Sequence, residues 1–257
     1  MMVRLSGYKG DHQPPTTSGD IFLLRPLPKT VLLDAGFTLT FPDHDRIASH
    51  AAEVGVRVDP AALARAEDPV RRELALYPWA STPAQQTTRP PSAGAAFFRR
   101  MLDLAGADAP GPTLDAAAST IWQRHLQRNV WCRVGAGVEA ALGRLRAAGM
   151  RLAVVSNSEG TVEAMLNEVG LARHLETVVD SWVVGVAKPD PRIFHIALER
   201  LGESPATAVM LGDVPAVDME GALAASITGV LIDPLDLHLA HTRRVPSLPA
   251  FVDALLG

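Results

Sequence analysis

Apolar residues follow two different spacings along the chain, and each spacing predicts one kind of element. Short apolar runs that end at a polar residue are typical of buried strands in a parallel sheet, because helices cover both faces of such a sheet. Five segments have this pattern: Val31–Leu33, Arg151–Ser156, Glu176–Asp180, Ala208–Gly212 and Ile227–Ile232. These segments predict the strands of an α/β domain.

Helical spacing fills the intervals between the later strands. The segments that predict helices are Val138–Ala148, Thr161–Val169, 190–201 and Met219–Ala225. Repeated strand, helix, strand units favour a parallel sheet with helices on both faces. The expected fold class is therefore α/β with a doubly wound parallel sheet.

The first predicted strand is separated from the others by a long segment of different character. Residues 43–133 are rich in alanine and carry apolar residues at helical steps, as at Ile47, Ala51 and Val54, and no strand is convincing there. Asp59 and Pro60 form a typical helix start. We expect an all-helical cap domain at 43–133, inserted into a core domain at 21–42 and 134–257. Residues 1–20 are polar and predict a disordered tail.

Composition excludes several classes of function. The net charge is −4 and basic residues are scattered, which argues against binding to nucleic acid or to an anionic membrane. Cys132 is the single cysteine, so no intramolecular disulfide forms and a cytoplasmic location is expected. No apolar run has the length of a membrane span.

Polar residues at the ends of the predicted strands supply candidate chemistry. Asp34 follows the first strand, Ser156 and Asn157 end another, and Asp213 follows Ala208–Gly212. The carboxyl ends of parallel strands meet at one edge of the sheet, where ligands bind in open α/β folds. Asp34 alone is equally consistent with an Asx turn at a strand end. Two carboxylates and a hydroxyl at one edge favour a functional site over an isolated Asx turn.

A lysine and a further carboxylate complete this set. Lys188 is one of three lysines, and it is the only lysine that follows the first predicted strand; Asp218 follows Asp213 by five residues. A carboxylate nucleophile repels a phosphate dianion, so a hard cation such as Mg²⁺ is needed between them, and a lysine and a hydroxyl stabilise the phosphate oxygens. The pattern favours phosphoryl transfer.

Four segments in this order resemble the haloacid dehalogenase-like hydrolase superfamily, in particular its subgroup with a helical cap between the first and second motifs. The segments are Asp34-x-Gly-x-Thr38-Leu, Val154-Val-Ser-Asn157, the run Gly185-Val-Ala-Lys-Pro-Asp-Pro-x-Ile-Phe194, and Leu211-Gly-Asp-(x4)-Asp-x-x-Gly-Ala222. The resemblance extends over about residues 30–235. It implies a Rossmann-like core and a small phosphorylated substrate.

The resemblance also implies a role for each motif residue. Asp34 would be the nucleophile that forms an aspartyl-phosphate, and Thr38 would position it. Ser156, the backbone of Asn157 and Lys188 would bind phosphate. The cofactor would be Mg²⁺, held by Asp34, the carbonyl of Gly36 and Asp213, with Asp218 as a further ligand or as an acid just outside the ligands.

Gly36 departs from the pattern of the superfamily's phosphatases, which carry a second aspartate there as general acid and base. Loss of a general acid costs about 10²- to 10⁴-fold in rate. We therefore expect a phosphatase of low efficiency, in which Asp43, His44 or Asp45 substitutes for the acid or simply begins a helix.

Other interpretations of Gly36 stay open. A homologue that binds a ligand or a protein without turnover has the same motifs. A 2-haloacid dehalogenase would need an early arginine such as Arg46 for the substrate carboxylate, and a phosphonatase would need a lysine in 43–133, where none occurs. Trp79, Trp122 and Trp131 are expected in the core of the helical segment or in a pocket. The histidines have no metal-ligand spacing.

Overall fold

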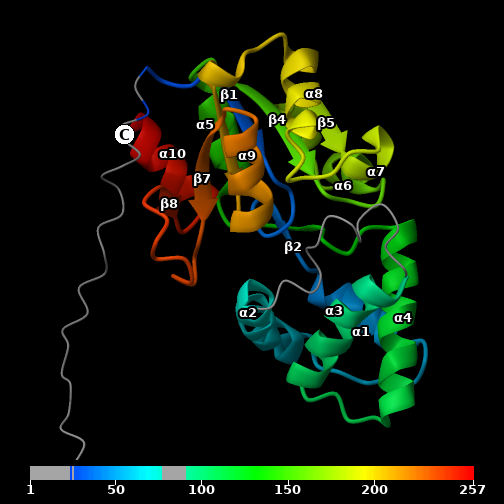
Figure 1. The fold of residues 1–257 in the computed structure, drawn as a ribbon. Helices are drawn as coiled ribbons and strands as arrows, with labels where there is room; N and C mark the ends of the chain where they lie inside the picture. Colours follow the sequence, from blue (N-terminus) through cyan, green and yellow to red (C-terminus); the bar gives the residue numbers. More distant parts are fainter. Residues whose placement is uncertain (1–23, 25, 77–90) are drawn as a thin grey trace, which may run out of the picture.

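The centre of the molecule is a parallel sheet that orders its strands β5-β4-β1-β6-β7-β8. The computed structural model describes Leu24, residues 26–76 and residues 91–257, and within these residues the sheet has six strands. The strands are β1 (Thr30–Leu33), β4 (Arg151–Ser156), β5 (Thr177–Asp180), β6 (Ala208–Gly212), β7 (Thr228–Ile232) and β8 (Arg244–Val245). Because β1 lies between β4 and β6, it is central although it comes first in the chain (Figure 1).

Successive side chains of each strand enter two separate cores. In β1, Val31 and Leu33 pack toward α5 (Val138–Ala147), α6 (Val162–Glu168) and α10 (Leu248–Leu256). Leu32, between them, packs toward α8 (Pro191–Leu201) and α9 (Glu220–Ala224) on the opposite face. This alternation explains why the strands have continuous apolar runs, since both of their faces are buried.

Shorter elements connect these strands and helices. They are α7 (Ser181–Val184), the 3₁₀ turns Ala172–His174 and Pro205–Thr207, and the π-helical turn Pro215–Met219. Asp190 caps α8, as its carboxylate accepts a hydrogen bond from the backbone N–H of Arg192 at 2.9 Å. Pro191 begins that helix, where its missing N–H costs nothing.

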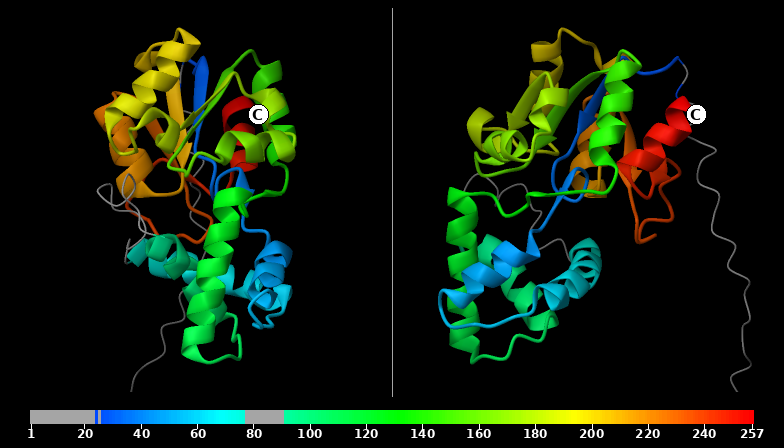
Figure 2. Two further views of the ribbon diagram at one scale, coloured as in Figure 1. Left: turned by 90° about the vertical axis from the view of Figure 1, so that its right-hand side faces the viewer. Right: turned by 180° about the vertical axis from the view of Figure 1, so that it is seen from behind.

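Four helices form a second packed unit between β2 (Thr40–Phe41) and β3 (Arg133–Val134), which pair antiparallel. They are α1 (His44–Ala52), α2 (Pro60–Leu76), α3 (Pro91–Leu104) and α4 (Gly111–Gln127), called here the helical unit. Ile47, Leu63, Phe98 and Ile121 lie in its own hydrophobic cluster and are fully buried. Figure 2 shows the helical unit and the sheet as two bodies joined through the β2 and β3 segments.

The expected doubly wound parallel sheet is confirmed. All five predicted strands and the four predicted helices agree with the structure to within one residue at each end, and the first strand begins one residue earlier than predicted, at Thr30. The short β2–β3 pair and β8 have too few residues to produce a pattern in sequence. The expected tail at 1–20 and Trp79 lie outside the described residues. Within the described parts of the chain, no helix has both the length and the hydropathy that a membrane span requires.

Candidate active site

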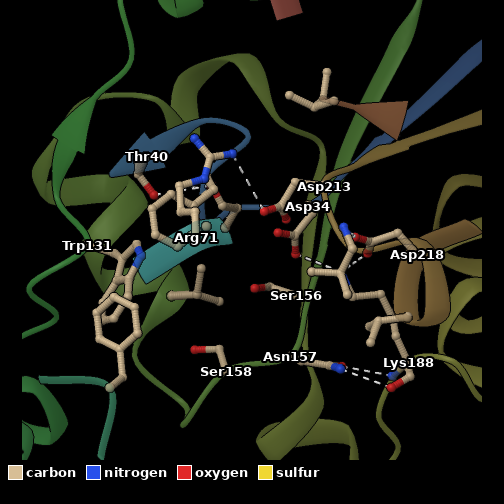
Figure 3. A pocket seen from close by; sticks show the side chains of 18 of the residues that line it. Asp34, Thr40, Arg71, Trp131, Ser156, Asn157, Ser158, Lys188, Asp213 and Asp218 are labelled. Atoms are coloured by element: carbon tan, nitrogen blue, oxygen red, sulfur yellow. Dashed lines mark hydrogen bonds and ion pairs between the residues drawn. The ribbon is translucent and has the colours of Figure 1, made fainter. Parts of the chain in front are cut away.

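Asp34 lies just beyond the carboxyl end of the central strand. Its backbone N–H donates a hydrogen bond of 2.8 Å to the carbonyl of Leu211 in β6, so the chain is still paired with its neighbour at this point. The neighbouring strands β4 and β6 bring Ser156 and Asp213 to the same edge (Figure 3). Convergence of polar groups here is a direct result of the parallel topology.

Lys188 is buried among carboxylates, with 1% of its surface exposed. Its Nζ donates hydrogen bonds of 2.6 Å to Oδ1 of Asp34 and 2.6 Å to Oδ1 of Asp218. The second oxygen of Asp218 accepts the backbone N–H of Val214 at 2.9 Å. A Cβ at Gly212 would lie 2.3 Å from the Asp218 carboxyl carbon, so only glycine lets this carboxylate approach the strand end.

The side chain of Asn157 holds the backbone of Lys188. Its amide nitrogen donates to the Lys188 carbonyl at 2.9 Å, and its amide oxygen accepts the Lys188 N–H at 2.8 Å. The sequence interpretation gave Asn157 a role through its backbone. The structure adds a positioning role for the side chain, because two bonds fix the segment from which the lysine enters the site.

Burial and mutual repulsion raise the pKa values of two carboxyl groups here. Loss of solvent raises the pKa of Asp34 to about 6, Lys188 opposes this shift, and Asp218 adds to it. Loss of solvent also raises the pKa of Asp213 to about 8, with further increases from Asp34 and Asp218 and a decrease from Arg71. Burial by itself lowers the pKa of Lys188, but Asp218 and Asp34 outweigh it, and the net direction is upward. The lysine therefore stays protonated.

The three carboxylates at this edge suit a hard divalent cation. Asp34, Asp213 and Asp218 each offer an oxygen, and these atoms lie within 4.8 Å of one another. Oxygen donors are the ligands that Mg²⁺ prefers. Burial raises the pKa values of Asp34 and Asp213, and repulsion among the three carboxylates adds to this increase, so a bound cation would favour their ionised forms. The donor set and its charge fit a bound magnesium ion.

A cavity of about 380 Å³ opens in front of these groups, between the sheet edge and the helical unit. Seven of the eight predicted site residues line it: Asp34, Gly36, Ser156, Asn157, Lys188, Asp213 and Asp218. Thr38 does not line the cavity. Its buried hydroxyl makes no hydrogen bond within the described residues, so its role in positioning Asp34 stays a prediction.

The loop that follows Asp34 has an unusual backbone. Phe37 has φ +52°, a left-handed conformation that is rare for a bulky side chain and costs on the order of 1 kcal/mol. The Phe37 N–H donates to the Thr40 carbonyl at 2.8 Å, and the ring packs edge-on against Phe41 and Trp131. These contacts hold the loop beside the carboxylate cluster.

Arg71 of α2 enters the site and was missed in the sequence. Its guanidinium lies 4.6 Å from the centre of the Phe37 ring and 4.0 Å from Oδ2 of Asp213, and its side chain is 11% exposed. It lines the cavity together with Lys188. Several arginines lie in the helical unit and no local pattern distinguishes Arg71, so sequence alone gave no signal for it.

A buried histidine and a glutamate line the cavity from opposite bodies. His125 of α4 lies 3.3 Å from Glu159, which follows β4, and its Nδ1 accepts the N–H of Val130 at 3.3 Å. Nδ1 is therefore unprotonated, and Nε2 carries the proton. The sequence interpretation took His125 for a surface or core histidine and gave no role to Glu159, because the contact between them forms only when α4 packs beside the end of β4.

The proposed substitutes for the missing acid do not line this cavity. Asp43 caps α1 by accepting the Arg46 N–H at 3.0 Å, which agrees with the structural interpretation of the segment. His44 and Asp45 are the first residues of that helix. Arg46, the candidate for a substrate carboxylate, instead pairs with Glu168 at 2.7 Å. Trp122 and Trp131 line the cavity and also belong to the cluster of the helical unit.

Comparison with known proteins identifies the family. The sequence profile of the haloacid dehalogenase-like hydrolases matches residues 28–226, which include all eight predicted site residues. The chain belongs to this family. A crystal structure of a phosphatase of this family from Thermococcus onnurineus has the same fold, with a TM-score of 0.56, 22% sequence identity, and 89% of this chain and 98% of that chain covered.

Curated relatives match one part of the chain. Haloacid dehalogenase-like hydrolase domain-containing protein 3 of Mus musculus is 41% identical over 126 residues, which are 46% of this chain and 50% of that protein. A phosphoserine phosphatase of Thermus thermophilus is 37% identical over 115 residues, which are 43% of this chain and 46% of that protein. The chain thus spans about half the length of the curated relatives it matches. Their names support a hydrolase with phosphatase-type chemistry.

Proposed function

We propose that this hydrolase is a Mg²⁺-dependent phosphatase that cleaves phosphate monoesters of small metabolites through an aspartyl-phosphate on Asp34. One observation carries the proposal: Asp34 is held by Lys188 within a set of three carboxylates, at the edge of the sheet where the cavity opens. Burial of charged groups is energetically costly. A protein that only binds a ligand would not need a buried cluster of a nucleophile, a lysine and two further carboxylates, so the cluster supports a catalytic role.

Each site residue has a definite task in this reaction. Asp34 would present a carboxylate oxygen to phosphorus, and Lys188, which is bonded to Asp34, would also contact an equatorial phosphate oxygen. Ser156 and the backbone of Asn157 bind the remaining phosphate oxygens. Asn157, through its side chain, keeps Lys188 in place.

The metal ion would be held by Asp34, the carbonyl of Gly36, Asp213 and Asp218. When bound, it supplies positive charge that reduces the repulsion between the Asp34 carboxylate and the phosphate dianion. Arg71 adds a second cation from the helical unit, close to Asp213.

The helical unit would act as the cap of this active site. Residues 43–133 would form the cap domain, and residues 21–42 and 134–257 the core domain that holds the catalytic groups. Support comes from the cavity, whose lining combines Arg71, His125 and Trp131 with the strand-end residues.

Phosphate release from a panel of monoesters tests the proposal. We expect release that requires Mg²⁺ and stops with EDTA, and we expect Asp34→Asn to lower it by at least about 10³-fold, because the nucleophile is lost. Mass spectrometry of acid-quenched protein should find a phosphorylated peptide that contains Asp34. Activity of Asp34→Asn at the native level would exclude the aspartyl route, and tight ligand binding without turnover would indicate a binding protein.

A further inference from the structure

The cavity wall beside the nucleophile is aromatic. A Cβ placed on Gly36 would lie 3.7 Å from Cδ1 of Trp131, so the absence of a side chain leaves the indole facing the loop of Asp34. The Trp131 ring packs against Phe97 at 5.0 Å and against Phe37 at 6.2 Å between ring centres. All three rings line the cavity. A group that leaves phosphorus on this side meets flat apolar surface.

Two polar side chains that line the cavity on the side of the helical unit, Asn129 and His125, are already hydrogen-bonded within the protein. Asn129 donates its amide to Thr161 at 3.1 Å and accepts the Trp131 N–H at 2.8 Å. Both nitrogens of His125 have partners, as described above. A sugar or polyol in this space would lose its hydrogen bonds to water without equivalent replacements from these residues. An apolar ring would lose none.

The loop that follows Asp34 presents no proton donor to the cavity for a leaving oxygen, and the Nε2 proton of His125 lies toward Glu159, 3.3 Å away. Gly36 has no side chain, and the hydroxyl of Thr40 donates to the Ala35 carbonyl at 3.3 Å. Asp233, at the end of β7, accepts two backbone N–H groups and pairs with Arg244. Without a proton, an alkoxide as basic as hydroxide departs slowly, whereas the oxygen of a phenol departs readily as an anion.

These observations point to one substrate class. We propose that the site prefers aryl phosphates, in which phosphate is joined to the weakly basic oxygen of an aromatic ring, over phosphates of sugars, polyols or hydroxy acids. This inference rests on the phosphatase function proposed above and specifies its substrate. The ring would stack in the space bounded by Trp131, Phe97 and Phe37.

The reaction balances without an acid from the protein. An oxygen of Asp34 bonds to phosphorus as the bond from phosphorus to the ring oxygen breaks, and the bonding pair leaves with the aryl oxide, which takes a proton from water. A second water attacks phosphorus, the carboxylate of Asp34 departs, and the proton released neutralises the hydroxide left by the first water. The products are a phenol and inorganic phosphate.

Four phosphate compounds test separately whether the site prefers an aromatic ring and whether it prefers a weakly basic leaving oxygen. Phenyl phosphate has a ring and a weakly basic leaving oxygen, and benzyl phosphate has a ring and a strongly basic one. Acetyl phosphate, whose carboxylate leaving group is even less basic than a phenol oxygen, and phosphoglycolate, whose leaving oxygen is strongly basic, have no ring. We expect kcat/KM to be highest for phenyl phosphate, about 10²-fold or more above benzyl phosphate and about 10-fold or more above acetyl phosphate.

Variants assign each preference to its residue. Gly36→Asp is sterically feasible, since its Cβ meets only ordinary contacts, and it should raise kcat for benzyl phosphate at least about 10-fold more than for phenyl phosphate. Gly36→Asn is the matched control, because it has a similar shape and no carboxyl proton. Trp131→Leu should raise KM for phenyl phosphate about 10-fold and leave acetyl phosphate nearly unchanged. Trp182→Leu, at a tryptophan that is 64% exposed on α7, should change neither.

The outcomes distinguish this inference from the function on which it rests. Release of phosphate from none of the four compounds, with Mg²⁺ present, would contradict the phosphatase function itself. Release that is as fast from phosphoglycolate as from phenyl phosphate would leave the phosphatase function intact and overturn the preference for aryl phosphates. Equal changes in kcat for benzyl phosphate in Gly36→Asp and Gly36→Asn would show that the lack of a general acid at Gly36 does not cause the preference for weakly basic leaving groups.

Discussion

The side chain of Asn157 contacts the candidate catalytic groups through the backbone of Lys188. Its two hydrogen bonds to the Lys188 backbone join the end of β4 to the segment that carries the lysine. We predict that Asn157→Ala lowers kcat by about 10- to 100-fold, with a smaller change in KM, because the lysine loses its fixed approach to Asp34.

A matched control removes another amide from the same domain. Asn167 donates to the Glu163 carbonyl on the exposed surface of α6, so Asn167→Ala should leave kcat unchanged. Steady-state kinetics of both variants with one aryl phosphate provide the comparison. An Asn157→Ala enzyme with native kcat would show that Lys188 needs no such support.

Lys188 neutralises two buried carboxylates, so its loss should affect stability as well as activity. We predict that Lys188→Met lowers the free energy of unfolding in metal-free buffer by about 3 kcal/mol, because Asp34 and Asp218 then face each other without a cation. Chemical denaturation measures this value. The double variant Lys188→Met/Asp218→Asn should recover a large part of the lost stability. If its loss instead equals the sum of the losses in Lys188→Met and Asp218→Asn, the two residues are not coupled.

Sequence revealed the residues of this site that follow a strand and missed those that tertiary packing supplies. Asp34 and Asp213 each follow a buried apolar run. A parallel sheet brings such positions together regardless of the length and conformation of the connecting loops. Arg71 and His125 lie within helices, and tertiary packing of the helical unit decides which face of each helix is turned toward the cavity. Their distance from Asp34 depends on the orientation of that unit, for which the sequence has no local signal.

The same distinction applies to whole elements. β4 and β6 were found because a fully buried strand needs a continuous apolar run, and α8 because Asp190 and Pro191 mark its start. The two-residue strands β2 and β3 form where the chain passes between the two packed bodies, and they exist through pairing with each other rather than through their own composition.

An ion-pair network joins elements of the helical unit to α6 of the sheet domain. Glu168 accepts hydrogen bonds from Arg128 at 2.8 Å and from Arg46 at 2.7 Å. These bonds, with that of Arg128 first, lower the pKa of Glu168 to about 2. Its carboxylate therefore connects the two bodies at neutral pH.

We predict a pH-dependent cost for Glu168→Gln. The carboxyl pKa is lower in the folded protein than its value of about 4.3 in the unfolded chain, so ionised Glu168 stabilises the fold above that value and loses its effect as pH falls toward 2. The side chain is 33% exposed, so solvent screening limits the loss to about 0.5–1 kcal/mol at pH 7. Urea denaturation should show this loss at pH 7 and little difference near pH 2.5.

Glu163→Gln is the control for that prediction. Glu163 is an exposed residue of the same helix, and its carboxylate makes no ion pair with any residue that the structure describes. Glu163→Gln should change the free energy of unfolding little at pH 7 or near pH 2.5. A loss in Glu168→Gln that persists unchanged at low pH would show that packing, not the ion pairs, accounts for it.

At the scale of the whole molecule, we expect the carboxylate cluster to make the stability of the protein depend on both metal and pH. The pKa values of Asp34 and Asp213 are raised to about 6 and about 8, so the metal-free folded protein holds these protons more tightly than the unfolded chain does. Its free energy of unfolding must then fall as pH rises from about 4 to about 8. If Mg²⁺ binds these carboxylates as proposed, it would offset this loss, because it would bind the folded state alone.

Asp213→Asn separates the two effects, since asparagine keeps the shape of the side chain and removes its charge. Without metal, we predict that the variant is more stable than the native protein at pH 8 by about 1 kcal/mol and equal to it near pH 4, where Asp213 is protonated. With Mg²⁺ at about 100 times its dissociation constant, the native protein gains about 2.7 kcal/mol and its Tm rises by about 5 °C or more, while the variant gains far less. Thermal unfolding with EDTA and with Mg²⁺ at both pH values measures all four quantities. Equal increases in Tm for the two proteins would mean that magnesium binds elsewhere, and the carboxylates at the sheet edge would then need another explanation.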